Sequence, residues 1–209
     1  MHINFLELRK LRQAQIPFNA ACRAAYEVGA DYIVRINDDT EFLTSGWITK
    51  GIQALQQFRP HYLGVVGPKC DQGNVEILTH DMVSRLHLDI FGMQYYPNEF
   101  DNWWIDDWIS RVYGRNNTLR VDAWEVYHHI DKHGTRYRVD ERRKRHLETT
   151  IARGRDKIRA FLKQRRLQVQ GRDADLRLPK SQLKFKAIGN SNRIQAAWGP
   201  SMDRFYNKK

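Results

Sequence analysis

Four groups of residues in this chain have types and spacings that could perform chemistry on a phosphorylated or hydroxylated substrate. The first is the run Asn37, Asp38 and Asp39, which follows the apolar residues 31–36. Adjacent carboxylates at the end of a buried strand are costly unless a cation or several donors meet them. A divalent ion that bridges a diphosphate needs only one or two such carboxylates. The alternative is a turn in which Asp38, Asp39 and Thr40 cap the next element.

The second group is an aromatic and acidic run, residues 103–108, which reads Trp-Trp-Ile-Asp-Asp-Trp. Aromatic rings can stack on the C–H face of a sugar while carboxylates bind its hydroxyl groups. One carboxylate could then act as a general base on an acceptor hydroxyl. The alternative is a capped helix whose tryptophans anchor the core, with Asp106 and Asp107 solvated.

The third group is the histidine pair His128 and His129, with His133 four residues beyond the second. Neutral imidazole is a good ligand for Mn²⁺ and similar ions, so a histidine at a strand end could complete a metal site with Asp39. A purely structural histidine is the alternative.

The fourth group is the glycine-containing loop from Gly67 to Asn74. Glycine removes side-chain bulk, so such a loop can approach a phosphate or a sugar closely. The loop matches neither the dinucleotide-binding fingerprint nor the phosphate-loop lysine motif, so this signal is weak when it is taken alone.

The elements that must position these groups read as alternating helices and strands. We expect a helix capped by Asn19 that ends at Gly29, and a strand over residues 31–36. Ser45 and Gly46 then open a second helix, and a strand over residues 62–66 is broken by Gly67 and Pro68. This order predicts a βαβ crossover and a parallel sheet, whose ligands bind beyond the carboxyl ends of the strands. Residues 37–39 and 67–74 should therefore lie at one rim.

The second half of the chain predicts fewer elements. Residues 124–129 read as a later strand that ends in the two histidines, and residues 141 to about 166 have helical spacing. Beyond Gly171 there is no clear period. We expect a domain over residues 1–166 and a basic, flexible tail over residues 167–209.

Composition and charge exclude several classes of protein. With 209 residues, 41% of them hydrophobic and 11% aromatic, the chain can bury a core and is not a largely disordered protein. No run of 18 apolar residues exists, so no transmembrane helix is expected. Cys22 and Cys70 are too few for a disulfide scaffold, so we expect buried thiols.

The net charge of +11 is unevenly distributed. Residues 141–209 hold 20 Lys and Arg against 6 Asp and Glu, a net of +14, while residues 1–140 hold 15 against 18, a net of −3. The chain is therefore a near-neutral body with a basic carboxyl-terminal third, rather than a uniformly basic protein.

Taken in this order, the four groups resemble the inverting nucleotide-sugar glycosyltransferases of the GT-A type. That family has a strand ending in an acidic cluster, a glycine loop, an acidic segment that carries the base, and a later metal-binding histidine. The segment from Trp104 to Ile109 is similar to one in N-acetylglucosaminyltransferase I. Residues 29–42, 79–81 and 133–137 are similar to glycosyltransferase domains of large algal viruses and their cellular relatives. The resemblance covers roughly residues 19–165.

This resemblance implies an α/β fold of the GT-A type, a Rossmann-like mixed sheet flanked by helices. It also implies a metal-dependent inverting transfer of a sugar from a nucleotide-diphosphate donor, of the UDP or GDP type, to a hydroxyl group of a glycan or glycoprotein. Mn²⁺ or Mg²⁺ would be the cofactor. The compartment stays open between the cytoplasm and, with an upstream anchor, the Golgi lumen.

The resemblance also assigns roles to individual residues. Asp39 and either His128 or His129 would hold the metal, and Asp107 would be the catalytic base. The donor would be bound by Asn37, Asp38, Gly67, Gln72, Gly73 and Asn74, and the acceptor by Tyr95, Tyr96, Trp103, Trp104 and Asp106.

Two departures from the family pattern leave alternatives open. The first departure is Asn37, which stands where the acidic cluster of the family often begins with Asp. The second is that only about 18 residues precede Asn19, so we expect the first strand or strands of the fold to be missing. The edge of the strand over residues 31–36 would then be unprotected, and the chain alone a poor enzyme.

The first alternative is a metal-dependent nuclease or nucleic-acid-binding protein that uses the two acidic pairs and the basic tail. The second is a non-catalytic sugar-binding remnant. No specific nucleic-acid partner is expected, because the basic residues do not interleave with the acidic pairs.

Overall fold

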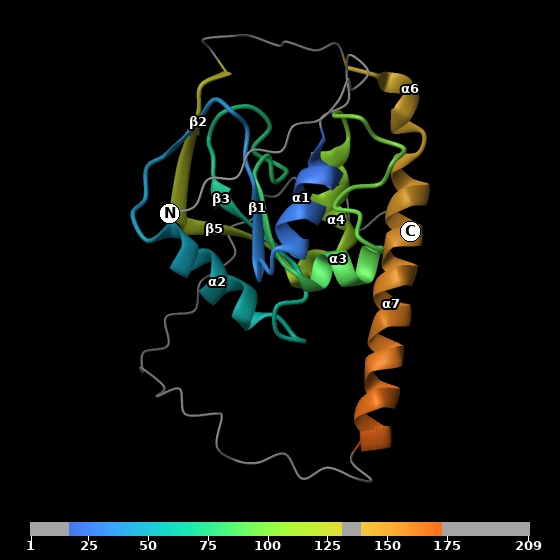
Figure 1. Ribbon diagram of the computed structural model, residues 1–209. Helices are drawn as coiled ribbons and strands as arrows, with labels where there is room; N and C mark the ends of the chain where they lie inside the picture. Colours follow the sequence, from blue (N-terminus) through green and yellow to red (C-terminus); the bar gives the residue numbers. More distant parts are fainter. Residues whose placement is uncertain (1–16, 131–138, 173–209) are drawn as a thin grey trace.

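The computed structural model describes residues 17–130 and 139–172, which form a five-stranded mixed sheet flanked by helices (Figure 1). The expected α/β class is confirmed at this level. The strands are β1 (Tyr32–Arg35), β2 (Thr40–Phe42), β3 (Val65–Lys69), β4 (Asp81–Ser84) and β5 (Thr118–His128). The helices are α1 (Phe18–Glu27), α2 (Trp47–Gln57), α3 (Leu86–Phe91), α4 (Ile105–Val112), the 3₁₀ turn η1 (Arg115–Asn117), α6 (Glu141–Lys144) and α7 (Leu147–Arg172). The predictions made for residues 1–16, for residues 133–137 and for the tail beyond Arg172 lie outside the described residues.

The sheet has the strand order β1-β4-β3-β5-β2. β4 runs antiparallel to both β1 and β3, while β3 and β5 are parallel and β2 is antiparallel to β5. The expected parallel sheet is therefore wrong: β1 and β3 point the same way, but β4 lies between them. Sequence reasoning missed β4 because this four-residue strand begins with Asp81 and ends with Ser84, and shows no alternating pattern.

Helix α1 begins two residues earlier than expected and ends before Gly29, whose φ of +91° only glycine adopts easily. The prediction that Asn19 caps this helix is wrong. Its side-chain Oδ1 instead accepts hydrogen bonds from the backbone N–H groups of Tyr95 (2.7 Å) and Tyr96 (2.8 Å). Its Nδ2 donates to the carbonyl of Tyr96 at 3.0 Å. Asn19 therefore fixes the segment that precedes α4 to helix α1.

Strand β3 continues through Gly67 and Pro68, so the prediction that these residues break it is also wrong. A Cβ atom at Gly67 would lie 2.4 Å from the carbonyl oxygen of His80, which explains why glycine is needed in this strand. Pro68 is tolerated because β3 pairs with β4 only at Val65 and Val66, and its pairing with β5 shifts register after Pro68.

The strand expected to end in histidines is present and is longer than predicted, because β5 already begins at Thr118. It pairs with β2 in a register that places Thr40 opposite His128. This pairing brings the turn after β1 beside the end of β5, and so sets the geometry of the candidate site.

Two apolar clusters hold the helices on the sheet. One contains Trp108, Tyr95 and Ile109 and packs with α7, which runs along α3 and α4 and continues past them (Figure 1). The other contains Trp124 and Leu55 beneath α2. Both cysteines are free and buried, as expected. No described helix is long and apolar enough to cross a membrane.

The helix expected over residues 141–166 is two helices. Asp140 caps α6 through a hydrogen bond from the backbone N–H of Arg142 to its side chain (3.2 Å), and α6 ends at Lys144. Helix α7 starts at Leu147 and extends to Arg172, beyond the predicted end.

We predict that Asn19→Ala lowers the free energy of unfolding by about 1–3 kcal/mol, because it leaves buried backbone groups of Tyr95 and Tyr96 without partners. Urea-induced unfolding followed by circular dichroism measures this change. Arg23→Ala, an exposed substitution on the same helix, is the control and should change stability by less than about 0.5 kcal/mol. Equal effects of the two substitutions would contradict the anchoring role of Asn19.

Candidate functional site

The turn after β1 meets the end of β5 and forms a polar site, which we call the rim site (Asn37, Asp39, Gln72, His80 and His128). The Oδ1 atom of Asp39 lies 2.9 Å from Nε2 of His128. The Nδ2 atom of Asn37 lies 3.1 Å from the same nitrogen. Asp38 is exposed at the tip of the turn. The structure thus brings the acidic run and a histidine of the third group together, as the sequence predicted.

Only one of the two adjacent histidines directs its ring to Asp39. The ring of His129 lies 3.1 Å from the carboxylate of Glu41, and its backbone N–H donates to the carbonyl of Asp39 at 2.9 Å. Successive residues of an extended chain point to opposite sides, which separates the two rings. His128 is therefore the candidate metal ligand that the geometry favours.

Asp39 and His128 are the residues of the rim site that could hold a divalent cation. Among residues 17–130 and 139–172, no group of three or more His, Cys, Asp or Glu side chains is arranged to hold a metal. A cation bound through a diphosphate needs only one or two protein ligands, since phosphate and water oxygens complete its shell. The 2.9 Å between Oδ1 and Nε2 is also the distance of an ordinary hydrogen bond, so the fit to a cation rests on the chemistry of the two side chains, a carboxylate and an imidazole.

Part of the predicted glycine loop also reaches the rim site. The side-chain oxygen of Gln72 accepts a hydrogen bond from the backbone N–H of His128 at 3.1 Å. Gly73 (φ +76°) and Asn74, whose Oδ1 accepts from the N–H of Glu76, form the exposed turn of the loop. Gln72 is therefore the predicted loop residue that a hydrogen bond brings to the rim site, whereas Gly67 lies within β3.

A buried guanidinium connects the rim site to the core. Arg35 is the inward-facing last residue of β1 and is only 4% exposed. Arginine offers five N–H donors, and the hydrogen-bond acceptors around Arg35 are oxygen atoms. They belong to Asp81 (2.9 Å), the hydroxyl of Tyr96 (2.9 Å), the carbonyl of Thr79 (2.6 Å), Asn37 (3.4 Å) and the carboxylate of Asp106.

The carboxylate of Asp81 is fully buried and accepts hydrogen bonds from the hydroxyl groups of Tyr95 and Tyr96. We call Arg35, Asp81, Tyr95, Tyr96 and Asp106 the Arg35 cluster. Both tyrosines had been expected to form an open platform for the acceptor. They are 0% and 3% exposed, so the structure corrects that expectation: their rings are core residues and their hydroxyls serve Asp81.

Asp106 and Asp107 have different surroundings although they are adjacent in α4. Asp106 contacts Arg35, and burial, opposed by the guanidinium, raises its pKa to about 6. Burial also raises the pKa of Asp107, whose carboxylate lies near Arg111 and Lys144 instead. Residues one apart on a helix do not share a face, so only Asp106 is joined to the rim site by contacts.

The two tryptophans before α4 are half-buried. Trp104 has a φ of +74°, an unfavourable value for a non-glycine residue, and its Nε1 donates to the carbonyl of Asp140 at 2.9 Å. The ammonium of Lys144 lies 5.0 Å from the centre of its ring. The side chain of Trp104 therefore contacts Asp140 and Lys144 at the start and end of α6. The contacts do not bring Trp103 or Trp104 to Asp39.

Sequence reasoning missed two residues of the site, Arg35 and His80. His80 is 1% exposed; its Nε2 lies 2.7 Å from the hydroxyl of Thr40, and its ring contacts that of His128 edge-on at 5.2 Å between centroids. Burial lowers the pKa of His80 to about 3, so its ring is neutral. Arg35 could have been found from the sequence, because it lies two residues after Ile33 in an otherwise apolar strand, and residues two apart in a strand face the same side.

Comparisons of the chain with protein-family models, with curated proteins and with solved structures found no match in any of the three. A function must therefore be argued from the geometry of the site together with the motifs of the sequence.

We predict that Arg35→Met lowers the free energy of unfolding by about 3–5 kcal/mol, because it leaves the buried carboxylate of Asp81 without its cation. Adding Asp81→Asn should restore part of that loss, since the double variant no longer buries the charge of Asp81, while Asp106 still lacks its cation. Urea unfolding of both single variants and the double variant measures the coupling.

The matched control is Arg159→Met, which removes an exposed arginine from α7 and should cost less than about 0.5 kcal/mol. Strictly additive effects of Arg35→Met and Asp81→Asn would show that the two side chains do not depend on each other.

Proposed function

We propose that this chain is a metal-dependent inverting glycosyltransferase of the GT-A type, with a nucleoside diphosphate sugar as donor and a hydroxyl group as acceptor. One observation carries the proposal. The contacts from His128 to Asn37, from Asn37 to Arg35 and from Arg35 to Asp106 join the expected metal residues to the expected acceptor segment. These parts are up to 91 residues apart in the chain, yet they form one contiguous polar site.

In this proposal Asp39 and His128 would hold Mn²⁺ or Mg²⁺. When bound, the ion offsets the negative charge that builds on the leaving diphosphate. Asn37 and Gln72 lie beside His128 and can bind oxygen atoms of the donor. His80, held neutral by burial, packs against the ring of His128 and limits its orientation.

The transfer step forms a bond between the acceptor oxygen and the anomeric carbon, and breaks the bond from that carbon to the diphosphate. A carboxylate takes the proton of the acceptor hydroxyl, and the configuration at the anomeric carbon inverts because the attack comes from the opposite face. The transition state has oxocarbenium character, as in sugar hydrolysis.

Two carboxylates of α4 compete for the role of base. The resemblance to the glycosyltransferase family assigns it to Asp107. The contacts favour Asp106, which Arg35 ties to the rim site and whose raised pKa of about 6 suits proton abstraction near neutral pH. In either case the other carboxylate would bind the acceptor.

The nuclease alternative is less well supported. It would require Asp38, Asp39, Asp106 and Asp107 to act together as metal ligands, and the described residues contain no such group. The resemblance to glycosyltransferases and the contacts between the rim site and α4 both favour sugar transfer.

We predict that UDP or GDP raises the melting temperature of the protein only when Mn²⁺ or Mg²⁺ is present, because the ion bridges the diphosphate to the chain. Asp39→Ala and His128→Gln should abolish this shift. Thermal unfolding with and without chelator measures it.

His129→Gln is the matched control for that experiment, since its ring faces Glu41 rather than Asp39, and it should keep the full shift. A shift of the same size in excess chelator would contradict the bridging cation.

We predict that one of Asp106→Asn and Asp107→Asn lowers the rate of sugar transfer by about 10²- to 10⁴-fold while the nucleotide–metal shift persists, because an amide cannot accept the proton. The other variant should act mainly on the KM of the acceptor. If Asp106 is the base, kcat/KM should also fall as the pH drops through about 6, where its carboxylate becomes protonated. Near-normal turnover in both variants would show that neither carboxylate of α4 is the catalytic base.

A further inference from the structure

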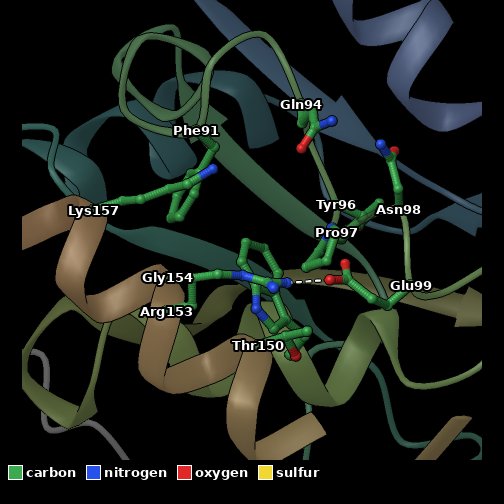
Figure 2. Close-up of a pocket in the computed structure, with 11 residues that line it drawn as sticks. Phe91, Gln94, Tyr96, Pro97, Asn98, Glu99, Thr150, Arg153, Gly154 and Lys157 are labelled. Atoms are coloured by element: carbon green, nitrogen blue, oxygen red, sulfur yellow. Dashed lines mark hydrogen bonds and ion pairs between the residues drawn. The ribbon is translucent and has the colours of Figure 1, made fainter. Parts of the chain in front are cut away.

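A cavity separate from the rim site lies between α7 and the segment that precedes α4, on the other side of Tyr96 from Arg35. It has a volume of about 360 Å³, within the range of small-ligand pockets, and opens between the two elements (Figure 2). Its polar lining is Gln94, Asn98, Glu99, Thr150, Arg153 and Lys157, and its floor is Phe91, Tyr96 and Trp108.

Three polar side chains of this pocket, those of Arg153, Glu99 and Asn98, are held in place by contacts. Figure 2 shows Arg153 of α7 and Glu99 facing each other across the pocket, joined by an ion pair. The side-chain oxygen of Asn98 accepts a hydrogen bond from Asn19 at 3.2 Å. The guanidinium of Arg143 binds Asp101 (2.5 Å), just beyond the pocket. The wall formed by residues 94–99 is therefore fixed to both α1 and α7.

Glycine shapes the back of the cavity. A Cβ atom at Gly154 would meet Val112 at 2.5 Å and Trp108 at 3.3 Å, so α7 lies directly against the apolar floor at this point. The floor residues are less than 5% exposed and offer a compact apolar base rather than open ring faces.

The chemistry of the lining selects a class of ligand. Two amides, a carboxylate, a guanidinium and an ammonium offer several donors and acceptors above the apolar floor. The carboxylate of Glu99 is paired with Arg153, so Lys157 leaves the lining with one net positive charge, which opposes a cationic ligand and does not hinder a neutral molecule. A neutral ligand with many hydroxyl groups and an apolar C–H face satisfies both parts of the pocket.

We infer that this pocket binds a neutral sugar unit of an extended glycan acceptor, separate from the unit that receives the transferred sugar. This inference rests on the proposed function for the role of the glycan, although the binding itself does not require transfer. Tyr96 separates the two sites: its ring lines the pocket and its hydroxyl lies 2.9 Å from Nε of Arg35. Trp108 of the floor follows Asp107 directly in α4. The pocket would therefore favour long acceptors over short ones.

The experiment is an NMR titration of the full chain with neutral trisaccharides (maltotriose, chitotriose and mannotriose), without donor or metal. At least one of them should shift the amide signals of residues 94–99 and 150–157. Asn98→Ala and Lys157→Ala should each weaken that binding by about 3- to 10-fold, the usual effect of one lost hydrogen bond. Lys163→Ala, which changes an exposed lysine of the same helix outside the pocket, should leave the binding unchanged.

Three results would overturn the inference: no trisaccharide binds, the pocket variants bind as well as Lys163→Ala does, or a trigalacturonate probe binds more tightly than every neutral sugar. The last result would assign the pocket to an anionic ligand instead. Failure of the proposed function is distinguishable, since it would remove the metal-dependent nucleotide shift and leave the trisaccharide titration intact.

Discussion

The charge of Arg35 is buried at the end of β1, and the rest of the site depends on how that charge is neutralised. Removing a guanidinium from water costs several kcal/mol unless carboxylates and oxygen acceptors surround it. Here Asp81 of β4 and Asp106 of α4 supply the negative charge, and Tyr96 supplies a hydroxyl. Because these carboxylates raise the pKa of Arg35 against the effect of burial, the side chain stays charged. Strand β4, helix α4 and the Tyr95–Tyr96 segment must therefore all be in place together, so that the core and the candidate site form one network.

Helix α4 gives its two adjacent carboxylates different surroundings. Asp106 faces β1 and forms an ion pair with Arg35, whereas Asp107 lies near Arg111 and Lys144. Arg111 in turn contacts Glu148 of α7 at 2.7 Å, and the ring nitrogen of Trp104 binds the residue that caps α6. The position of α4 is thus set from the sheet on one side and from α6 and α7 on the other, which is the kind of rigid support that a base and an acceptor-binding group require.

The sequence predicted those parts of the site that follow from local patterns. The acidic run after a short apolar strand, and the histidines after a later one, could be placed at strand ends, and Asp39 and His128 do meet. Strand β4 could not be predicted, because its burial comes from neighbours on both sides and not from its own polar-ended sequence. The burial of Tyr95 and Tyr96 could not be predicted either, since a pair of aromatic residues near acidic ones has the same sequence pattern whether its hydroxyls face a sugar or a buried carboxylate. Asn19 was misassigned for a related reason: its amide binds a segment more than 70 residues away rather than its own helix.

The pairing of β2 with β5 has a consequence for the way the chain folds. Asn37 and His128 are 91 residues apart, and they meet only because Thr40 pairs with His128 at the outer edge of the sheet. Closing so long a loop has an entropic cost, which is offset only when the intervening strands also pair. Without the pairing of β2 with β5, Asn37 and Asp39 would be separated from His128 even where β3 and β4 are paired. In the proposed function, metal-dependent nucleotide binding would therefore report that β2 is paired with β5.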